Sequence, residues 1–400
     1  MNILLIGPLP SEAGGENPGG VAHHLWYLAQ ALTSRGHNIE ILALGRKPGH
    51  DRLNKGIQIY GERNRLTSSL LSSTKIIRSF PMWLKMTSFR DILHLCNSIV
   101  RINRLGKRLQ SYDIIHIHGI HSCCLLALRH LAINTPSIVT IHSYHDVIFQ
   151  DSVEFKRRRL GFINFNLKYA KATIHVSETD YLRSIKLNVS LPTINFIVHN
   201  GVKSSPEKIK YLKRKNSFCF VGGLNERKRI ELVLRALEYR QSSRFSLVIA
   251  GSGNQKPFVV DCLKKIKNFE YVGSVSNENV RKIMRNSYVL VVPSRSESFG
   301  LVYIEALLEG AAVIGYAEVI EEFHRLMDLN DDEKALLVPF SSKCDDPLKL
   351  SLLMSKTADW RNSEPGSLAM QSLKRKTSDH FAWEGISNKL TTIYEEVSGV

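Results

Sequence analysis

The sequence VLVVPSRSESFGLVYIEALL, residues 289–308, places a strand, a loop and a helix in direct succession. Residues 289–292 form a short apolar run, which is typical of a strand that is buried on both faces of a parallel sheet. Small and polar residues follow at 293–300, and residues 301–308 then carry apolar side chains at helical spacing. Because strands and helices alternate in this way along nearly the whole chain, the sequence predicts an α/β protein with two doubly wound, Rossmann-like domains.

The predicted strands fall into two series, separated by the polar stretch KSSPEKIKYLKRKN. This stretch is rich in lysine and has no strand pattern, as expected of a linker. The predicted strands are 2–6, 39–44, 113–117, 137–141, 173–176 and 195–198 in the first series, and 218–221, 247–250, 269–272, 289–292 and 312–315 in the second. The predicted parts of the chain are an N-terminal domain (1–202), a linker (203–216), a C-terminal domain (217–380) and a terminal helix (381–400).

The composition is that of an ordinary globular protein. Of the 400 residues, 43% are hydrophobic and 23% are charged, a balance that excludes general disorder. The six cysteines include no CxxC pair, so we expect neither a disulfide framework nor a zinc site, and a reducing compartment fits best. No apolar run reaches the roughly 18–20 residues that span a bilayer, and residues 1–9 lack the basic start of a secretory signal. We therefore expect a cytoplasmic protein.

The net charge of +17 favours an anionic partner, and much of it is concentrated in one segment. Residues 46–108 contain 14 lysines and arginines against three acidic residues, and Phe80, Trp83 and Phe89 are among the apolar residues between them. Such a pattern is typical of a helix that lies in the headgroup layer of an anionic membrane. It is equally consistent with a solvated helix whose apolar side belongs to the core, and the sequence leaves both interpretations open.

Two glycine-containing loops that follow predicted strands are candidates for binding an anion. The first, GPLPSEAGGENPGG (7–20), ends with Gly19 and Gly20 at a helix start but lacks the GxGxxG spacing of a dinucleotide site. The second, VGGLNERK (221–228), places Lys228 at the start of a helix, where a cation is unfavourable unless an anion binds there too. The alternatives are a flexible surface loop in the first case and a solvent-facing basic turn in the second.

The loop PSRSESFG (293–300) is the most specific of the candidate sites. We expect Ser298 to cap the following helix, which puts Glu305 about two turns inside that helix, roughly 10 Å from its start. Glu297 and Glu305 are then too far apart for the carboxylate pair of a glycosidase. The spacing fits a nucleotide diphosphate that lies along the helix with its phosphates at the amino end. A pair of surface glutamates is the alternative, although a carboxylate among apolar residues, as at Glu305, usually has a partner.

Histidines follow two further predicted strands. VTIHSYHD (139–146) carries His142, His145 and Asp146 after its strand, and HIHGIH (116–121) ends another. A metal site or a catalytic relay would use such residues, but they do not have the spacing of a fixed ligand set. We expect them to line a ligand site or to be satisfied core residues, and three histidines in one short stretch keep a metal site open as the alternative.

The segment ESFGLVYIEAL (297–307) resembles the signature of glycosyltransferase family 4, the retaining, nucleotide-sugar-dependent enzymes of GT-B fold. Other stretches resemble further blocks of this family, in the family's order. These are the Gly19-Gly20 helix ending in SRGH (34–37), YDIIHIHG (112–119), VTIH (139–142), HNGV (199–202), FVGGLNERK (220–228), VIAGSG (248–253), YVGSVSNENV (271–280), ALLVPF (335–340) and FAWEGISNKLTTIYEEV (381–397). The resemblance therefore covers nearly the full length of the chain.

The resemblance implies a GT-B architecture, with an interdomain cleft and a C-terminal helix (381–400) that crosses back to the first, acceptor-side domain. It implies that Glu305 holds the ribose hydroxyls, that Glu297 binds hydroxyls of the donor sugar and that Lys228 neutralises the leaving diphosphate. His142 would lie beside the transferred sugar, so His142, Glu297 and Lys228 are the expected catalytic residues. The implied donor-binding set is Gly222, Gly223, Arg227, Lys228, Arg229, Ser298, Phe299, Gly300, Leu301 and Glu305, and the implied acceptor-binding set is Gly19, Gly20, His118, His145 and Asp146.

Two positions near the phosphates depart from the family pattern. The family usually has arginine where this chain has Gly223, and glycine where it has Arg229. One phosphate-binding cation is therefore missing from its expected place. The sequence leaves open whether Arg227 or Arg229 replaces it, because only a correctly aimed guanidinium gives bidentate contacts.

We predict a retaining glycosyltransferase of the hexosyltransferase type, which moves a sugar from a nucleotide-diphosphate donor to a glycan or lipid-linked glycan in cell-surface polysaccharide or lipopolysaccharide synthesis. Protein cations at the phosphates can lower the barrier without a metal, so we expect no metal or cofactor. An anionic membrane surface, at the inner face of the plasma membrane, is the further partner that the basic segment suggests, and no nucleic acid is expected. The alternatives are a nucleotide-sugar epimerase of the same fold, a non-catalytic GT-B protein and a basic nucleic-acid-binding protein.

Overall fold

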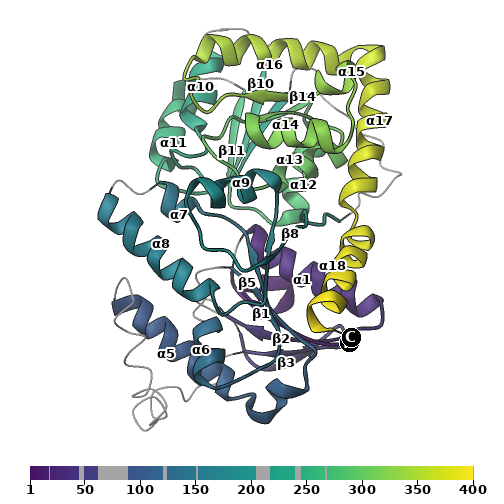
Figure 1. Cartoon of the computed structure of the whole chain (residues 1–400). Helices are drawn as coiled ribbons and strands as arrows, with labels where there is room; N and C mark the ends of the chain where they lie inside the picture. Colours follow the sequence, from purple (N-terminus) through teal and green to yellow (C-terminus); the bar gives the residue numbers. More distant parts are fainter. Residues whose placement is uncertain are drawn as a thin grey trace. The chain divides into compact units, whose positions relative to one another are not determined.

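The computed structural model describes residues 1–17, 19–44, 49–61, 89–119, 124–149, 152–203, 217–238, 245–265 and 268–399. The chain forms two compact units (Figure 1). The first contains Met1–Gly201 together with Trp383–Val400, and the second contains Val202–Ala382. Most of the predicted linker, residues 204–216, lies outside the described residues, as do residues 46–48 and 62–88 of the basic segment.

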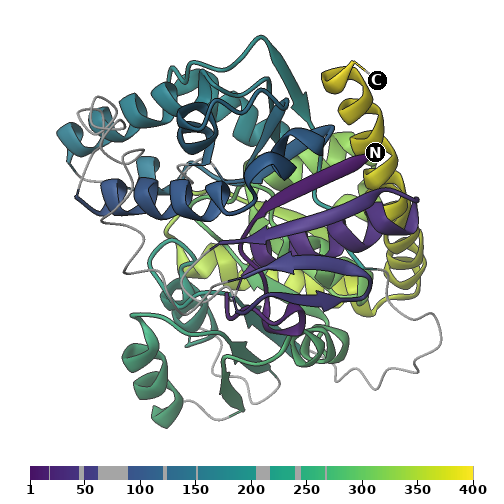
Figure 2. The same cartoon turned by 90° about the horizontal axis from the view of Figure 1, so that it is seen from below.

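The first unit is built on an eight-stranded sheet of order β3-β4-β2-β1-β5-β6-β7-β8. Its strands are β1 (Asn2–Gly7), β2 (Asn38–Ala43), β3 (Arg52–Asn54), β4 (Ile57–Tyr60), β5 (Ile114–His118), β6 (Ser137–Ile141), β7 (Ala172–His175) and β8 (Ile194–Ile197). All neighbours are parallel except β3 and β4, and Figure 2 shows β1 to β4 as the purple and dark blue end of the sheet. The strand order reverses between β1 and β5, which is the topological switch point where ligands bind in open α/β sheets.

Helices cover both faces of this sheet because successive side chains of a strand point to opposite sides. Leu4 and Ile6 of β1 belong to a core cluster with α5, α6 and α8, while Ile3 and Leu5 belong to a cluster with α1 and α18. The helices of this unit are α1 (Gly20–Ser34), α5 (Phe89–Asn103), α6 (Cys124–His130), α7 (His145–Ile148), α8 (Val153–Leu167), α9 (Glu178–Lys186) and α18 (Trp383–Ser398), with the 3₁₀ turns η1 (Ser11–Ala13) and η2 (Gly106–Ser111).

The second unit has a six-stranded, entirely parallel sheet of order β11-β10-β9-β12-β13-β14. Counted along the chain this is the order 3-2-1-4-5-6 of a Rossmann fold, whose switch point lies between β9 and β12. The strands are β9 (Ser217–Val221), β10 (Ser246–Ala250), β11 (Phe269–Gly273), β12 (Val289–Val292), β13 (Ala312–Tyr316) and β14 (Leu337–Phe340). The helices are α10 (Ile230–Glu238), α11 (Lys256–Lys265), α12 (Asn277–Asn286), α13 (Leu301–Leu308), α14 (Ala317–Leu326), α15 (Asp331–Lys334), α16 (Pro347–Asn362) and α17 (Glu364–Phe381).

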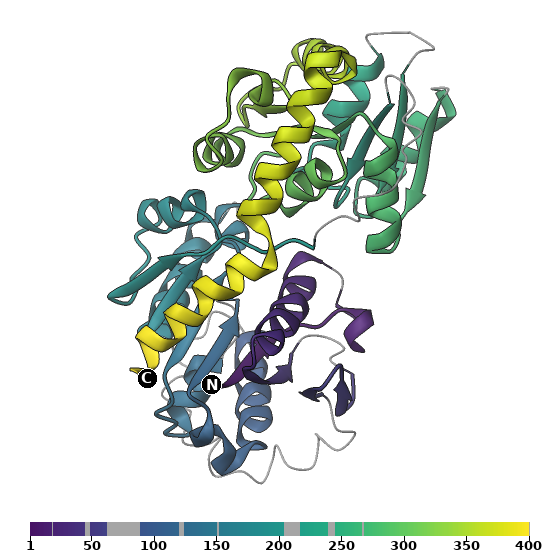
Figure 3. The same cartoon turned by 90° about the vertical axis from the view of Figure 1, so that its right-hand side faces the viewer.

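The C-terminal helix returns to the first unit, as predicted. The chain passes from α17 to α18 through the extended residue Ala382. The last yellow helix in Figure 3 is α18. Its residues Ile386, Leu390 and Tyr394 belong to the core cluster on the α1 side of the first sheet. The Tyr394 hydroxyl also bonds to Nδ1 of His116 on β5, at 2.7 Å. The terminal helix is therefore a structural part of the first unit.

Three strands of the structure are missing from the prediction. β3 and β4 lie inside the basic segment, where the sequence suggested a helix. β14 lies in the stretch ALLVPF (335–340), which resembles a family block but was not predicted to be a strand. Among the described residues, no helix is both long enough and apolar enough to cross a bilayer.

Candidate functional site

The loops after β9 and β12 bring Lys228 and Glu297 together at the switch point of the second sheet. Nζ of Lys228 donates a hydrogen bond to Oε1 of Glu297 at 2.5 Å, and the Ser294 hydroxyl donates to the same oxygen at 2.6 Å. Nη1 of Arg227 lies 3.3 Å from the other carboxylate oxygen. Lys228 and Glu297 are both buried, so the pair forms a compact, desolvated ionic centre.

Opposing effects act on the pKa values of the two members of this pair. Burial would raise the pKa of Glu297, but attraction to Lys228 and Arg227, with hydrogen bonds from Lys228 and Ser294, outweighs burial and lowers that pKa to about 2. Burial lowers the pKa of Lys228, and the negative charge of Glu297 opposes this effect. Glu297 is therefore an obligate hydrogen-bond acceptor here and has no proton to give to a leaving group.

The helix after β12 begins at Leu301, and its N-cap is Gly300 with φ 71°, not Ser298. The prediction of a Ser298 cap is wrong because the chain enters this helix through a left-handed residue, which glycine adopts most easily. A Cβ on Gly300 would lie 2.4 Å from Cδ2 of Tyr303. The Tyr303 hydroxyl in turn donates to the carbonyl of Val292 and accepts from the amide of Tyr316, so this tyrosine ties the loop to two strands.

Glu305 lies closer to the helix start than the sequence suggested. With α13 starting at Leu301, Glu305 is in the second turn, about 6 Å from the start at 1.5 Å per residue. Its side chain is partly exposed, where the sequence suggested burial among apolar neighbours. The buried carboxylate of this helix end is Glu309, which receives hydrogen bonds from Arg281 and Arg285.

Of the two arginines that could replace the missing cation, Arg229 is already used within the second unit. Its guanidinium donates to the carbonyls of Ser342 and Cys344, and the side chain is buried. Arg229 is thus unsuited to the predicted role in donor binding. Arg227 donates to the carbonyl of Ser296 at 2.7 Å and a quarter of its side chain is exposed. It is the better placed of the two to reach a phosphate beside Lys228.

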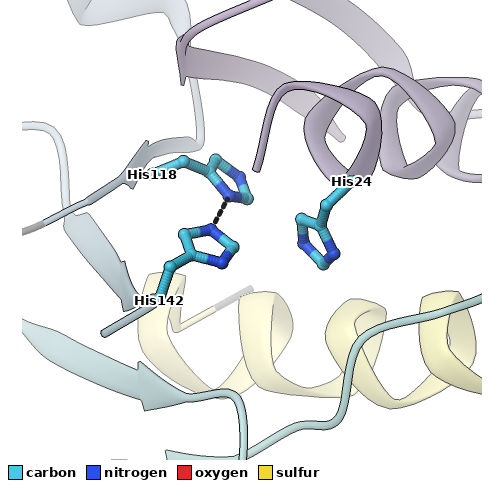
Figure 4. A group of neighbouring side chains, drawn as sticks. All are labelled: His24, His118 and His142. Carbon is cyan, nitrogen blue, oxygen red and sulfur yellow. Dashed lines mark hydrogen bonds between the residues drawn. The ribbon is translucent and has the colours of Figure 1, made fainter. Parts of the chain in front are cut away.

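In the first unit, three histidines from three elements converge, as Figure 4 shows. His24 comes from α1, His118 ends β5, and His142 follows β6. Nδ1 of His118 lies 3.2 Å from Nε2 of His142, and the ring centroid of His24 is 5.4 and 5.1 Å from theirs. The sequence placed His118 and His142 in the site but missed His24, whose position in α1 resembles that of an ordinary core residue.

Burial keeps these imidazoles neutral. It lowers the pKa of His142 to about 4, and it lowers the pKa values of His24 and His118 well below the usual range, with nearby histidines adding to the effect. His116 is buried next to them, and burial lowers its pKa to about 3. Its ring nitrogens bond to Tyr394 and to Thr140, so His116 is a satisfied core residue. Neutral imidazoles suit hydroxyl groups better than anions.

The same three histidines are the group in the described part of the chain that could hold a metal ion. One ring nitrogen from each lies within 4.8 Å of the others. Imidazole donors suit zinc, copper and nickel. The absence of a metal requirement stays a prediction.

The remaining predicted acceptor residues lie on α1 and α7. Gly19 precedes α1 with φ 120° and has open space around it, and Gly20 begins the helix one turn before His24. His145 begins α7, and Asp146 accepts a hydrogen bond from Nε of Arg159 on α8 at 3.1 Å. Trp383, which the sequence did not single out for the site, has its ring centroid 5.2 Å from that of His24.

Comparisons with known proteins give the family. A model described as Glycosyltransferase Family 4 matches residues 18–205, and a model described as Glycosyl transferases group 1 matches residues 203–333. Together these models cover most of the chain. The chain belongs to glycosyltransferase family 4.

Relatives of this glycosyltransferase include enzymes that act on lipids and on cell-surface glycans. It is 23% identical to the phosphatidyl-myo-inositol mannosyltransferase of Mycolicibacterium smegmatis, over 96% of this chain and 91% of that protein. It is 27% identical to an O-antigen biosynthesis glycosyltransferase of Escherichia coli, over 54% of this chain and 64% of that protein.

Solved structures establish the GT-B fold of the glycosyltransferase. Sucrose-phosphate synthase from Thermosynechococcus elongatus aligns with a TM-score of 0.73 and 20% identity, over 99% of this chain and 98% of that chain. The HepE protein of Anabaena, in complex with UDP-glucose, aligns with a TM-score of 0.68 and 12% identity, over 99% of this chain and all of that chain.

Proposed function

We propose that this glycosyltransferase moves a hexosyl group, with retention of configuration, from a nucleotide-diphosphate donor to a glycan or lipid-linked glycan. The observation that carries the proposal is the buried Lys228–Glu297 pair at the switch point of the second sheet. A buried cluster of a lysine, an arginine and a glutamate is suited to a ligand that has an anionic part beside hydroxyl groups. A nucleotide sugar is such a ligand.

The donor chemistry follows from this pair. When the bond from the anomeric carbon to the phosphate oxygen breaks, its electron pair stays on the diphosphate and positive charge develops on the sugar. In the proposed reaction, Lys228, Arg227 and backbone amides at the start of α13 stabilise the leaving diphosphate. On donor binding, Lys228 would exchange part of its bond to Glu297 for a phosphate oxygen. Glu297 would then accept hydrogen bonds from sugar hydroxyls, while Glu305 would hold the ribose.

In this proposal the first unit supplies the neutral histidines. His142 bonds to a hydroxyl of the transferred sugar. Nδ1 of His118 lies within hydrogen-bonding distance of Nε2 of His142. Gly19, Gly20, His145 and Asp146 contribute to the acceptor side. In a single-step reaction with retention, the acceptor oxygen approaches on the face that the diphosphate leaves, so the acceptor proton can pass to the departing phosphate oxygen. No metal ion is needed for this step.

A lipid-linked acceptor at the cytoplasmic face of a membrane is part of the proposal. It is supported by the lipid named for the mannosyltransferase relative and by the positive charge of this chain. The membrane role of segment 46–108 stays a prediction. In the described part of that segment, Arg104 pairs with Asp51 and Arg108 pairs with Glu40, so these two cations are already engaged in the first unit.

Calorimetry against UDP-, GDP- and ADP-sugars, followed by a transfer assay, tests the proposal. The expected result is that one donor binds and that Glu305→Ala weakens its binding, while Glu278→Ala on α12, an exposed glutamate of the same unit, does not. Unchanged donor affinity in Glu305→Ala would overturn the assignment of Glu305. Turnover of the donor to an epimer without any acceptor would replace the transferase with an epimerase, and no turnover of any bound donor would indicate a non-catalytic protein.

A further inference from the structure

His24, His116, His118 and His142 form one cluster in the first unit, and their hydrogen bonding differs. Both ring nitrogens of His116 have hydrogen-bond partners. Nδ1 of His24 and Nε2 of His118 are buried and have no hydrogen-bond partner among the described residues. Buried polar atoms without a partner are rare in folded proteins and call for an explanation. These two histidines are therefore not satisfied core residues in the way that His116 is.

The spacing of His24, His118 and His142 matches that of three imidazoles around a tetrahedral metal ion. Zinc binds imidazole nitrogens at about 2.0–2.1 Å, which places two such nitrogens about 3.3 Å apart and their ring centroids about 5.2 Å apart. Nδ1 of His118 lies 3.2 Å from Nε2 of His142. The three separations between ring centroids are 5.4, 5.1 and 5.4 Å. The rings therefore stand at the corners of a nearly regular triangle of the size that zinc requires.

A small rotation of His24 completes this geometry. One ring nitrogen from each histidine lies within 4.8 Å of the others, so the largest gap exceeds the expected spacing by about 1.5 Å. The torsion that turns a histidine ring is soft, and Figure 4 shows the His24 ring on α1 facing the pair formed by His118 and His142. His142 is partly exposed, whereas His24 and His118 are buried. The cluster is thus open to an entering ion on the His142 side.

We propose that His24, His118 and His142 form a binding site for a transition-metal ion of the zinc class, with water as the fourth ligand. Imidazole nitrogens suit zinc, copper and nickel, whereas magnesium and calcium prefer oxygen ligands. The ion takes no part in the proposed transfer. One consequence rests on the proposed function: because His142 bonds there to a hydroxyl of the transferred sugar, an ion that occupies His142 competes with the sugar and inhibits transfer.

Calorimetry of the metal-free full chain with zinc chloride tests the site, with magnesium chloride as the control ion. His24→Gln and His24→Phe each remove one ligand, and phenylalanine keeps a ring beside Trp383, whose centroid lies 5.2 Å from that of His24. The matched controls are His23→Gln, the partly exposed neighbour on α1, and His380→Gln, which is exposed on α17. Circular dichroism and thermal unfolding establish that each variant is folded.

We expect a saturable site that holds one zinc ion per chain and no binding of magnesium. Both His24 variants should lose zinc affinity at least about 100-fold, because changes to groups that only support metal ligands already cost about 10–100-fold. Cobalt(II) bound to the unchanged chain should show the visible bands of a tetrahedral ion, without the near-ultraviolet band of a thiolate ligand. Absence of zinc binding, unchanged zinc affinity in both His24 variants, an equal loss in either control, or a thiolate band would overturn the proposal.

Transfer assays separate this inference from the proposed function. Zinc that fills the site should slow transfer by the unchanged chain, and a chelator should restore the rate. Each variant is compared with its own zinc-free rate, so the His24 variants should resist zinc, whereas an effect of zinc on the nucleotide would appear in every variant. If zinc binds through His24 but no nucleotide sugar is turned over, the metal site holds and the proposed function fails. If transfer proceeds and zinc affinity does not depend on His24, the reverse is true.

Discussion

Replacing Lys228 with methionine tests the ionic centre of the second unit most directly. Methionine keeps an unbranched side chain of comparable length, so the substitution removes the charge with little change in packing. In the structure, Glu297 would then keep the hydrogen bond from Ser294 at 2.6 Å and Arg227 at 3.3 Å. The carboxylate would remain buried with a weaker set of partners.

The expected loss of stability can be bounded from the structure. Removing one member of a fully buried ion pair costs about 3–5 kcal/mol when the other charge is left uncompensated. The pKa of Glu297, lowered from its usual 4.5 to about 2, corresponds to about 3 kcal/mol of favourable interaction for the charged form. Because Arg227 and Ser294 supply part of that interaction, we expect Lys228→Met to lower the free energy of unfolding by about 2 kcal/mol. The double variant Lys228→Met with Glu297→Gln should lose no more than this, because the unpaired charge is gone.

Urea unfolding at neutral pH measures both variants, and a transfer assay measures activity. We expect kcat/KM to fall at least 10²–10³-fold in Lys228→Met, as when a group that stabilises transition-state charge is removed. Lys264→Met, at an exposed lysine of α11, serves as the control and should change neither quantity. If the stability losses of Lys228→Met and Glu297→Gln simply add in the double variant, the two side chains are not coupled and the reasoning is refuted.

Three further outcomes follow from particular residues. Gly300→Ala should lower the unfolding free energy by about 1–3 kcal/mol, because alanine is strained at φ 71° and its Cβ would meet the Tyr303 ring. Thermal unfolding measures this change. The control is Gly385→Ala, at a position on α18 with open space around it. Gly223→Arg should tighten nucleotide-sugar binding about fivefold in calorimetry, since the position has no positive φ and a Cβ there would closely approach the amide end of the Asn225 side chain and lie at ordinary contact distance from the Ser252 carbonyl. Unchanged or weaker binding would contradict a phosphate beside this loop. Burial lowers the pKa of His116 to about 3, while a histidine in the unfolded chain titrates near 6.5, so the unfolded state binds more protons below pH 6.5. The free energy of unfolding should therefore fall from pH 6.5 towards pH 4. In urea titrations, His116→Gln should remove the part of this fall that His116 causes.

The elements that the sequence predicted best are those whose residue pattern fits only one type of secondary structure. The strands 137–141 and 289–292 have the bounds that the sequence suggested, because each is an unbroken run of buried residues between residues that favour turns. β14 escaped prediction because Pro339 stands in its middle, which normally argues against a strand. The structure places it at the edge of the sheet, next to β13 alone, where a missing amide donor is tolerated.

The pairing within the site was beyond the sequence for a different reason. Lys228 and Glu297 were each assigned to the donor, but they are 69 residues apart. Their contact depends on β9 and β12 being neighbours in the sheet. The local residue pattern of either segment does not determine the order of the strands. Arg229 shows the same limit, since its burial depends on the carbonyls of Ser342 and Cys344, which a separate loop supplies.

The contact between Lys228 and Glu297 also constrains the order of events at the site. A glutamate with a pKa of about 2 stays ionised at any pH at which the protein works, so it cannot act as the acid that protonates a leaving group. In the proposed mechanism the charge that stabilises the departing diphosphate comes from Lys228 and Arg227, which contact Glu297 in the structure. If this is so, donor binding redistributes these bonds: a phosphate oxygen accepts a hydrogen bond from Lys228, and sugar hydroxyls then donate to the Glu297 carboxylate. A ligand with phosphates but no sugar would accept a hydrogen bond from Lys228 but would bring no hydroxyl groups to donate to Glu297. On this argument a nucleotide sugar should bind more tightly than the corresponding nucleoside diphosphate, and Glu297→Gln should reduce that preference.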